Sequence, residues 1–141
     1  MKFAMTLTFV CVLSFIATGK VEAIDKATPR VVKVLATAYC PCSKCCGWGA
    51  RGITSAGNDA RKPGVAADVR RFPYGTRLAI PGVGVRVVDD TGKALRKDAK
   101  NGVARIDVRF SKHKDAVKFG RKLVLVKVLP TPKDDTVLRK K

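Results

Sequence analysis

The stretch that decides the fold is VRVVDDTGKALRKDAKNGVARIDVRF, residues 85–110. Two apolar, strand-like runs in it end at or pass through aspartate, at the pair 89–90 and again at Asp107. Upstream, GVAAD (64–68) ends a third such run in Asp68. Burying a carboxylate costs free energy unless the group is paired or protonated. Carboxylates inside strand-like runs therefore mark the first place to look for function.

Six short apolar segments have the composition and alternation of β-strands: residues 31–39, 64–68, 77–80, 85–88, 103–110 and 122–129. One helix is expected at 112–119, with Ser111 as its N-cap and Gly120 closing it. Residues 48–63 and 91–103 are expected to be loops, because they are rich in polar residues and glycine. Many short strands, many turns and one late helix predict a small β-barrel.

Residues 1–23 are typical of a secretory signal peptide. Lys2 supplies the positive start, residues 3–18 are mostly apolar, and VEA at 21–23 fits a small-residue cleavage site. The apolar run is shorter than the roughly 20 residues that a membrane span needs, so a retained anchor is not expected. The remainder is predicted to be one domain at 31–129, with a short lead at 24–30 and a flexible basic tail at 130–141.

The chain is strongly basic: 29 Lys and Arg against 11 Asp and Glu give a formal net charge of +18. Such a charge draws a protein to anionic polymers, of which nucleic acid is the commonest. Export argues against nucleic acid, and so does the low aromatic content of 6%, with no interleaving of basic and aromatic residues for stacking bases. We therefore expect the basic surface to bind anionic polymers outside the cell and not nucleic acid.

Four cysteines crowd into CPCSKCC, residues 40–46. In an exported protein an even number of cysteines favours disulfides, here two, and a bridge between the neighbours Cys45 and Cys46 is the most strained option. The alternative is a metal site, although structural zinc usually takes two separated pairs of ligands. Its ligands would be the thiolates of Cys40, Cys42, Cys45 and Cys46. Disulfides are favoured, and no metal or cofactor is expected.

Two further features have a plain structural interpretation beside a functional one. His113, the single histidine, is expected to be a surface residue of the helix, since the sequence shows no cysteine, serine or metal partner for it. The basic residues of 93–100 are either a solvated loop or a basic lip beside the carboxylates that attracts an anionic substrate.

The aspartates also admit two interpretations. Asp68 and Asp90 could simply turn the chain by bonding nearby backbone N–H groups. Around Asp107, alternation puts the two apolar neighbours on one face and the charged residues of ARIDVRF on the other. That charged face is either exposed surface or part of an acid-catalytic or sugar-binding cleft.

Taken in order, the pieces resemble the three-aspartate (3D) domain, which is the double-psi β-barrel of MltA-type lytic transglycosylases and of small exported wall-remodelling proteins of bacteria. The matching segments are ATAY (36–39), GITSAG (52–57), GVAAD (64–68), PYGTRLAIPGVG (73–84), VVDDTG (87–92), RIDVRF (105–110) and HKDAVKFGRKLVLVKVL (113–129). Variants with a CPCxxCCG cluster after the first strand are also familiar in this group.

The resemblance implies a mainly β fold, a small six-stranded double-psi β-barrel with one short helix before the last strand. It also implies acid catalysis on peptidoglycan, with the family's three aspartates at Asp68, Asp90 and Asp107. The family reaction cleaves the MurNAc–GlcNAc bond without water, because the 6-hydroxyl of MurNAc attacks its own anomeric carbon and leaves a 1,6-anhydro end. Residues that could line the site and contact the glycan are Thr37, Tyr39, Thr54 and Thr91.

In this reaction Asp107 would be the general acid, and Asp68 and Asp90 would raise its pKa through like charge. The family's short glycine-rich link before the third aspartate is replaced here by KALRKDAKNG, an extra basic loop. We expect a bacterial protein of the cell wall or periplasm, a lytic transglycosylase whose partners are peptidoglycan glycan strands. The alternative is a non-catalytic wall-binding or wall-loosening module, as in the expansin-like relatives of this barrel. A third possibility is a basic protein held on anionic wall polymers by charge alone.

Overall fold

The computed structural model describes residues 28–48 and 50–130. The expected signal peptide at 1–23 and nearly all of the expected tail at 130–141 lie outside these residues. Among the helices of the described part, none combines the length and the apolar composition that crossing a membrane requires.

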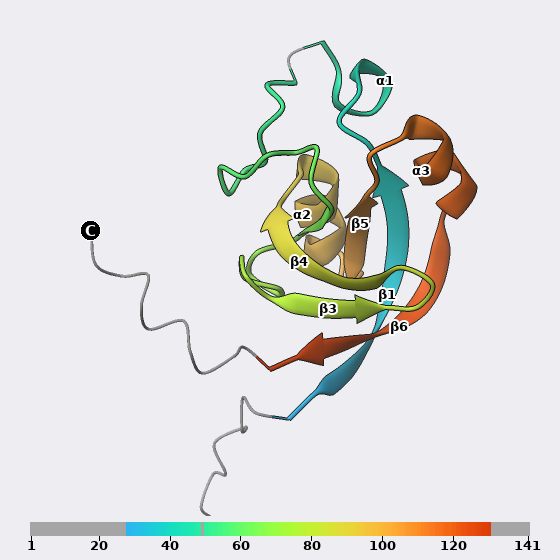
Figure 1. Ribbon diagram of the computed structural model, residues 1–141. Coiled ribbons are helices and arrows are strands. Elements are labelled where there is room, and N and C mark those ends of the chain that lie inside the picture. Colours follow the sequence, from blue (N-terminus) through green and yellow to red (C-terminus); the bar gives the residue numbers. More distant parts are fainter. Residues whose placement is uncertain (1–27, 49, 131–141) are drawn as a thin grey trace, which may run out of the picture.

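Six strands close into a barrel in the order β1-β5-β2-β4-β3-β6 (Figure 1). They are β1 (Arg30–Tyr39), β2 (Gly64–Ala67), β3 (Arg77–Ile80), β4 (Gly84–Asp90), β5 (Arg105–Arg109) and β6 (Lys122–Leu129). Within the described residues three helices accompany them: α1 (Ser43–Cys46), α2 (Lys93–Lys100) and α3 (His113–Phe119). The predicted six-stranded barrel with a helix before the last strand is confirmed.

The strand pairing is mixed, and this brings distant parts of the chain together. β1 runs parallel to β5, and β2 runs parallel to β4, whereas the other four neighbouring pairs are antiparallel. Because β1 and β5 are parallel, their carboxyl ends meet at one end of the barrel, beside α1 and α3 (Figure 1).

The barrel is filled by its own apolar side chains. Every second residue of a strand points inward, and the inward residues of these short strands are aliphatic. The completely buried members include Val34, Ala36, Val65, Ala67, Leu78, Val88, Ile106, Val108 and Val126. Burial of this alternating set fixes the register, because a slip of one residue would expose all of it.

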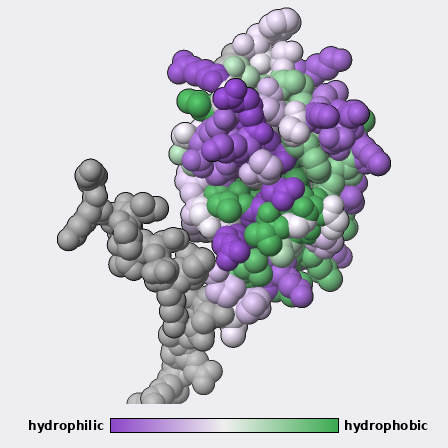
Figure 2. All heavy atoms as spheres, viewed as in Figure 1, coloured by the Kyte–Doolittle hydropathy of each residue, from purple (hydrophilic) through white to green (hydrophobic). Residues whose placement is uncertain are grey.

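Apolar residues also lie on the outside. In Figure 2 hydrophobic residues gather where β3 and β4 cross the front of the molecule, with hydrophilic residues above them. Val85 and Val87 of β4 are 44% and 43% exposed. Exposed apolar side chains are ordinary in folded proteins, because the polar residues do not suffice to cover the surface.

Residues 93–100, expected to be loop, form the helix α2 instead. Seven of the eight residues in KALRKDAK are good helix formers, and the side chain of Leu95 is the buried one of the helix. Gly92 precedes the helix and Gly102 follows it with a positive φ of 78°. The flanking glycines suggest a loop by composition, whereas here they bound a helix.

The start of α3 also differs from the expectation. Lys112, not Ser111, occupies the N-cap, in an extended conformation and without a side-chain capping bond. The short helix α1 within the cysteine segment was not expected either. The strand ends shift only slightly: β4 continues to Asp90, and β5 begins at Arg105 instead of Val103.

Candidate functional site

Asp90 and Asp107 come from the two strands that flank β2. Ala66 pairs with Asp107 across the antiparallel β2–β5 ladder and with Asp90 across the parallel β2–β4 ladder. Two strand spacings, roughly 10 Å, therefore separate the Cα atoms of the two aspartates. Both aspartates are register partners of Ala66, one on each side of β2. They are close enough for the negative charge of Asp90 to raise the pKa of Asp107.

Asp107 is the carboxyl group that is disposed to keep its proton. Burial raises its pKa above the ordinary value, and the negative charge of Asp90 raises it further. A hydrogen bond from Thr37 Oγ1 to Asp107 Oδ1, 3.0 Å long, and the charge of Arg105 only partly oppose this. Thr37 is the register partner of Asp107 on β1, so the bond follows directly from the strand pairing.

Asp90 is disposed in the opposite way. Burial acts to raise its pKa, but hydrogen bonds outweigh burial and hold the pKa below the ordinary value. Oδ1 accepts from Ser55 N at 3.0 Å, Ser55 Oγ at 2.7 Å and Thr91 N at 2.9 Å, while Oδ2 accepts from Tyr39 OH at 2.7 Å. The lowered pKa keeps Asp90 ionised. A carboxylate offers about four lone-pair sites for hydrogen bonds, and these four donors use nearly all of that capacity.

Behind Asp90 lies a buried ion pair that the sequence did not predict. Arg109, only 1% exposed, donates to both oxygens of Asp89, from Nη1 at 3.0 Å and from Nη2 at 2.6 Å. Its Nε donates to Lys62 O at 2.8 Å, and Nη1 also donates to Tyr39 OH at 3.1 Å. Burial raises the pKa of Tyr39, which therefore keeps the proton that it donates to Asp90.

Gly64 makes room for this pair. A Cβ at this position would collide with the guanidinium of Arg109 and lie 2.6 Å from Asp89 Oδ1. Gly64 is also the register partner of Arg109 across the β2–β5 ladder. A residue with a side chain would therefore displace the ion pair that supports Tyr39.

Ser55 and Tyr74 join the site from loops, and the sequence alone did not single them out. Tyr74 OH donates to Ser55 Oγ at 2.9 Å, and Ser55 in turn holds Asp90. Both lie in segments quoted for the resemblance, GITSAG and PYGTRLAIPGVG, but loop residues have no periodicity that would mark them. That position within the quoted segments was the one available signal.

The expected glycan-contacting residues fall into two groups. Thr37 and Tyr39 bond the two aspartates directly. Thr54 is buried and closes a turn, accepting from Asn58 N at 3.1 Å through Oγ1. Thr91 Oγ1 is buried and has no hydrogen-bond partner among the described residues, next to the backbone N–H that bonds Asp90.

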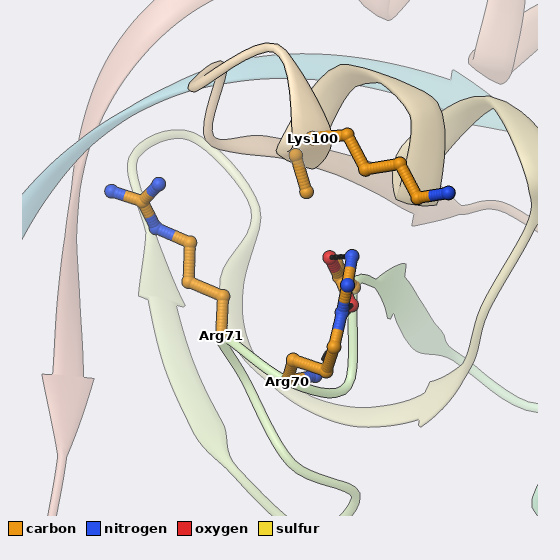
Figure 3. A pocket seen from close by; sticks show the side chains of 5 residues that line it. Arg70, Arg71 and Lys100 are labelled. Carbon is orange, nitrogen blue, oxygen red and sulfur yellow. Dashed lines mark hydrogen bonds and ion pairs between the residues drawn. The ribbon is translucent and has the colours of Figure 1, made fainter.

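Asp68 is engaged elsewhere. Arg70 holds it with a bond from Nη2 to Oδ2 at 2.7 Å, and the Arg70 side chain lowers the pKa of Asp68. No hydrogen bond or ion pair joins Asp68 to Asp90 or Asp107 within the described chain. Instead it lines a pocket of about 400 Å³ between the end of β2 and α2 (Figure 3), together with Arg70, Arg71, Ala99 and Lys100. Its part in catalysis stays a prediction.

The basic residues of α2 form a second, neighbouring pocket of about 540 Å³. All five residues that line it are cationic: Arg70, Lys93, Arg96, Lys97 and Lys100. The helix thus turns what looked like a basic loop into one basic surface, whose charges draw anionic groups.

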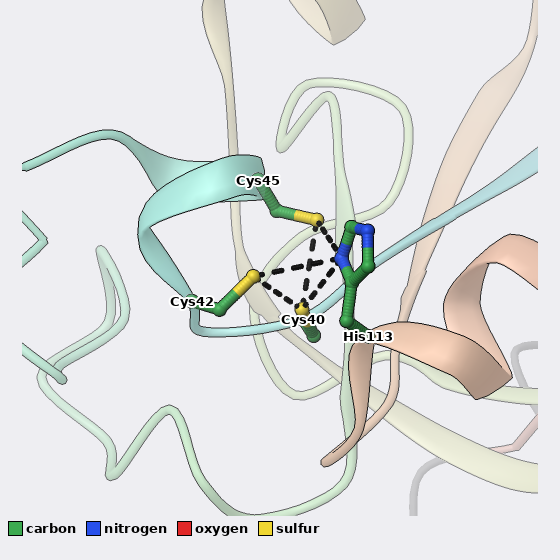
Figure 4. Close-up of side chains that lie close together, drawn as sticks. All are labelled: Cys40, Cys42, Cys45 and His113. Carbon is green, nitrogen blue, oxygen red and sulfur yellow. Dashed lines mark hydrogen bonds between the residues drawn. The ribbon is translucent and has the colours of Figure 1, made fainter.

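Three cysteines meet the single histidine at the end of the barrel (Figure 4). The Nδ1 atom of His113 lies 3.5 Å from the Sγ atoms of Cys40 and Cys45 and 3.6 Å from that of Cys42. The expectation that His113 has no thiol partner is therefore wrong, because the parallel β1–β5 pairing brings α3 beside the cysteine segment. Cys46 is not in this group; its Sγ donates to Cys40 O at 3.3 Å.

The four cysteines are free thiols in this structure, and the expected disulfides stay a prediction. A hydrogen bond from the Cys40 thiol lowers the pKa of Cys42 to about 6. Burial raises the pKa of Cys40 to about 12. The metal alternative considered four cysteine ligands, whereas the groups that could hold an ion are three thiols and an imidazole.

No family model matches the chain. Over 110 residues, 77% of its length, the chain is 32% identical to the "Putative cell wall shaping protein YabE" of Bacillus subtilis (strain 168). The match covers 25% of that protein, so the chain spans about a quarter of the length of this relative.

Proposed function

We propose that this protein acts on bacterial cell-wall peptidoglycan as a lytic transglycosylase, with Asp107 as general acid and base. The observation that carries the proposal is the opposite shift of two neighbouring carboxyl groups, with the pKa raised at Asp107 and lowered at Asp90. Environments that separate two pKa values in this way assign one group as proton donor and the other as fixed charge. The similarity to a protein named for cell wall shaping supports the wall as the source of the substrate.

The chemistry needs one carboxyl group that is protonated at the start. Asp107 gives its proton to the glycosidic oxygen as the bond from that oxygen to the anomeric carbon of MurNAc breaks. The 6-hydroxyl of the same MurNAc bonds to the anomeric carbon, and its proton passes to the Asp107 carboxylate. The products are a free GlcNAc hydroxyl and a 1,6-anhydro end, and Asp107 is again protonated.

Asp90 fits a supporting role. A hydrolase of the inverting kind needs a second carboxylate to activate water, and a retaining one needs a nucleophile. Asp90 already accepts four hydrogen bonds, which leaves it little capacity for either task. Its fixed negative charge instead stabilises the positive charge that develops at the anomeric carbon. Thr37, through its bond to Asp107, orients the acid.

The experiment that tests the proposal measures cleavage and binding separately. Dye-labelled sacculi are incubated with wild type, with Asp107→Asn and with Asp59→Asn, and both released dye and pelleted protein are quantified. Asp59 is a matched control because the only described partner of its side chain is the exposed Arg61 of the same loop. We expect Asp107→Asn to lose release by about 100-fold or more while still pelleting, since general acid catalysis contributes about 10²–10⁴-fold. Asp59→Asn should behave as wild type.

Two results would redirect the assignment. If the wild-type protein pellets with the sacculi but releases no dye, the protein is a non-catalytic wall-binding module. If wild type and Asp107→Asn release equal amounts of dye, Asp107 is not the general acid.

A second candidate function is retention on anionic wall polymers. The supporting observation is the pocket of about 540 Å³ that is lined by five cationic side chains, four from α2 and the fifth from Arg70. Such binding would hold the protein at the wall and is compatible with catalysis at Asp107.

A further inference from the structure

The cluster of Cys40, Cys42, Cys45 and His113 has no part in the reaction proposed above. Its four donor atoms lie within 4.8 Å of one another. They come from three places: the carboxyl end of β1, the turn of α1, and the start of α3. Side chains that converge in this way from separate elements are positioned by the fold and not by one local turn.

The distances can be compared with those that a tetrahedral ion imposes. Zinc binds sulfur at about 2.3 Å and imidazole nitrogen at about 2.0–2.1 Å, which places a sulfur and a nitrogen ligand about 3.6 Å apart. The three Sγ–Nδ1 distances are 3.5, 3.6 and 3.5 Å. Two sulfur ligands of one zinc lie about 3.8 Å apart, and the Sγ atoms of Cys40 and Cys45 are 3.6 Å apart.

One edge differs. The Sγ atoms of Cys40 and Cys42 are 2.8 Å apart, so an ion at the centre requires them to separate by about 1 Å. Cys42 is only half-buried. A disulfide between this pair needs an S–S distance of about 2.05 Å. It would not account for the nearly equal distances from His113 Nδ1 to all three sulfur atoms.

We infer that Cys40, Cys42, Cys45 and His113 bind one Zn²⁺ ion in a closed Cys₃His site that fastens α3 to the end of β1. Thiolate and imidazole ligands in a tetrahedral set are typical of zinc, whereas calcium and magnesium take oxygen. Four protein ligands leave no open position, so the site is structural and not catalytic.

Cys46 supplies the matched control. It is adjacent to a proposed ligand and belongs to the same short helix, yet its thiol bonds the backbone of Cys40 and lies outside the ligand group. A site defined by cysteine density alone would include Cys46. A site defined by the fold excludes it.

The test uses reduced protein, handled without oxygen and titrated with Co²⁺, which reports tetrahedral thiolate coordination through its visible bands, and then with Zn²⁺. Wild type and Cys46→Ser should each bind one Co²⁺ with that spectrum and exchange it for Zn²⁺. Cys45→Ser and His113→Ala should bind more weakly by over about 100-fold, since even groups behind the ligands are worth roughly 10- to 100-fold. Zn²⁺ should raise the melting temperature of wild type and Cys46→Ser alone.

A second measurement needs only the wild type, so it still tests the site if the ligand variants fold poorly. Iodoacetamide labelling of folded wild type with Zn²⁺ should modify Cys46 and spare the other three cysteines, and a chelator should expose all four. Absence of tetrahedral bands in fully reduced wild type, or equal affinity in His113→Ala, would overturn the inference. So would protein recovered after export with two disulfides and no zinc.

Discussion

At the scale of single residues, the ion pair of Arg109 and Asp89 supports the candidate site. Arg109 belongs to β5, Asp89 to β4, and the Tyr39 hydroxyl that Arg109 bonds belongs to β1. Burying both charges is tolerable because the guanidinium binds both carboxylate oxygens and a backbone carbonyl. The pair thereby links Tyr39, a hydrogen-bond donor to Asp90, to strands β4 and β5.

Removing one member of this pair is expected to be costly. Arg109→Met leaves the buried Asp89 carboxylate without its partner, which should lower the free energy of unfolding by about 3–5 kcal/mol. The double variant Arg109→Met/Asp89→Leu should recover much of the loss, because no unpaired charge stays buried. Urea unfolding measures both. Arg61→Met, which breaks an exposed ion pair, should change little, and an equal loss there would contradict the explanation.

The two opposed carboxyl groups should give opposite dependence of stability on pH. The folded-state pKa of Asp107 is raised, so its contribution to stability is present below the ordinary value of about 3.9 and is lost as pH rises through the raised pKa. Compared with Asp107→Asn, wild type should therefore lose stability over that interval. Asp90 has a lowered pKa, so its contribution is present above about 3.9 and is lost as pH falls through the folded value.

Urea midpoints over a pH series compare wild type with Asp107→Asn and with Asp90→Asn. The first difference should grow with rising pH, as wild type loses stability relative to Asp107→Asn. The second should shrink with falling pH, as wild type loses its advantage over Asp90→Asn. Curves that run parallel for both variants would contradict the assignment of the acid.

What the sequence could show at this scale was the position of each aspartate, not its environment. Asp90 and Asp107 look alike as residues at strand ends, and both are half-buried. Their difference depends on Ser55 and Tyr39, which reach Asp90 from 35 and 51 positions away in the chain. No local pattern records contacts of that range.

At the scale of elements, strands were easier to predict than helices. The alternating residues of β1 and β6, several of them β-branched, placed these two strands to within one residue, because burial with a period of two can be recognised in the sequence. The helix α2 was missed because its glycine flanks resembled a loop, although KALRKDAK has strong helix propensity.

The cap of α3 offers a test of element boundaries. Lys112 has the extended N-cap conformation, with φ −115° and ψ 138°, but makes no side-chain capping bond. Lys112→Ser should therefore stabilise the protein by about 1 kcal/mol, because a serine hydroxyl can accept from a free N–H of the first turn. Thermal unfolding measures it. Ser111→Ala, at the position first expected to be the cap, should have no comparable effect; a loss of that size would place the helix start one residue earlier.

At the scale of the whole molecule, closure of the barrel explains what composition could not. The four proposed zinc ligands span 73 positions, from Cys40 to His113, and no local pattern in the sequence joins them. The parallel pairing of β1 with β5 does so, because each strand delivers its following segment to the same end. The cysteine segment was conspicuous in the sequence, but its partner depended on topology.

The basic surface is a property of the molecule as well, and it should act through charge. Lys97→Glu/Lys100→Glu on α2 should weaken binding to a polyglycerol-phosphate polymer more than Lys114→Glu/Lys118→Glu on α3, although net charge changes equally. Binding of wild type should fall steeply with added salt, because exposed charges are screened. Equal effects of the two double variants, in a co-sedimentation assay, would assign the binding to net charge instead of to the α2 pocket.

The most direct measurement for the central claim is the chemical identity of the glycan ends that the protein creates. Mass spectrometry of the soluble products from unlabelled sacculi, digested in ¹⁸O-water by wild type and by Asp107→Asn, distinguishes the possible reactions. The account predicts 1,6-anhydro-MurNAc ends without ¹⁸O from wild type and none from Asp107→Asn. Reducing ends that carry ¹⁸O would show a hydrolase, and would contradict a reaction in which Asp107 works without water.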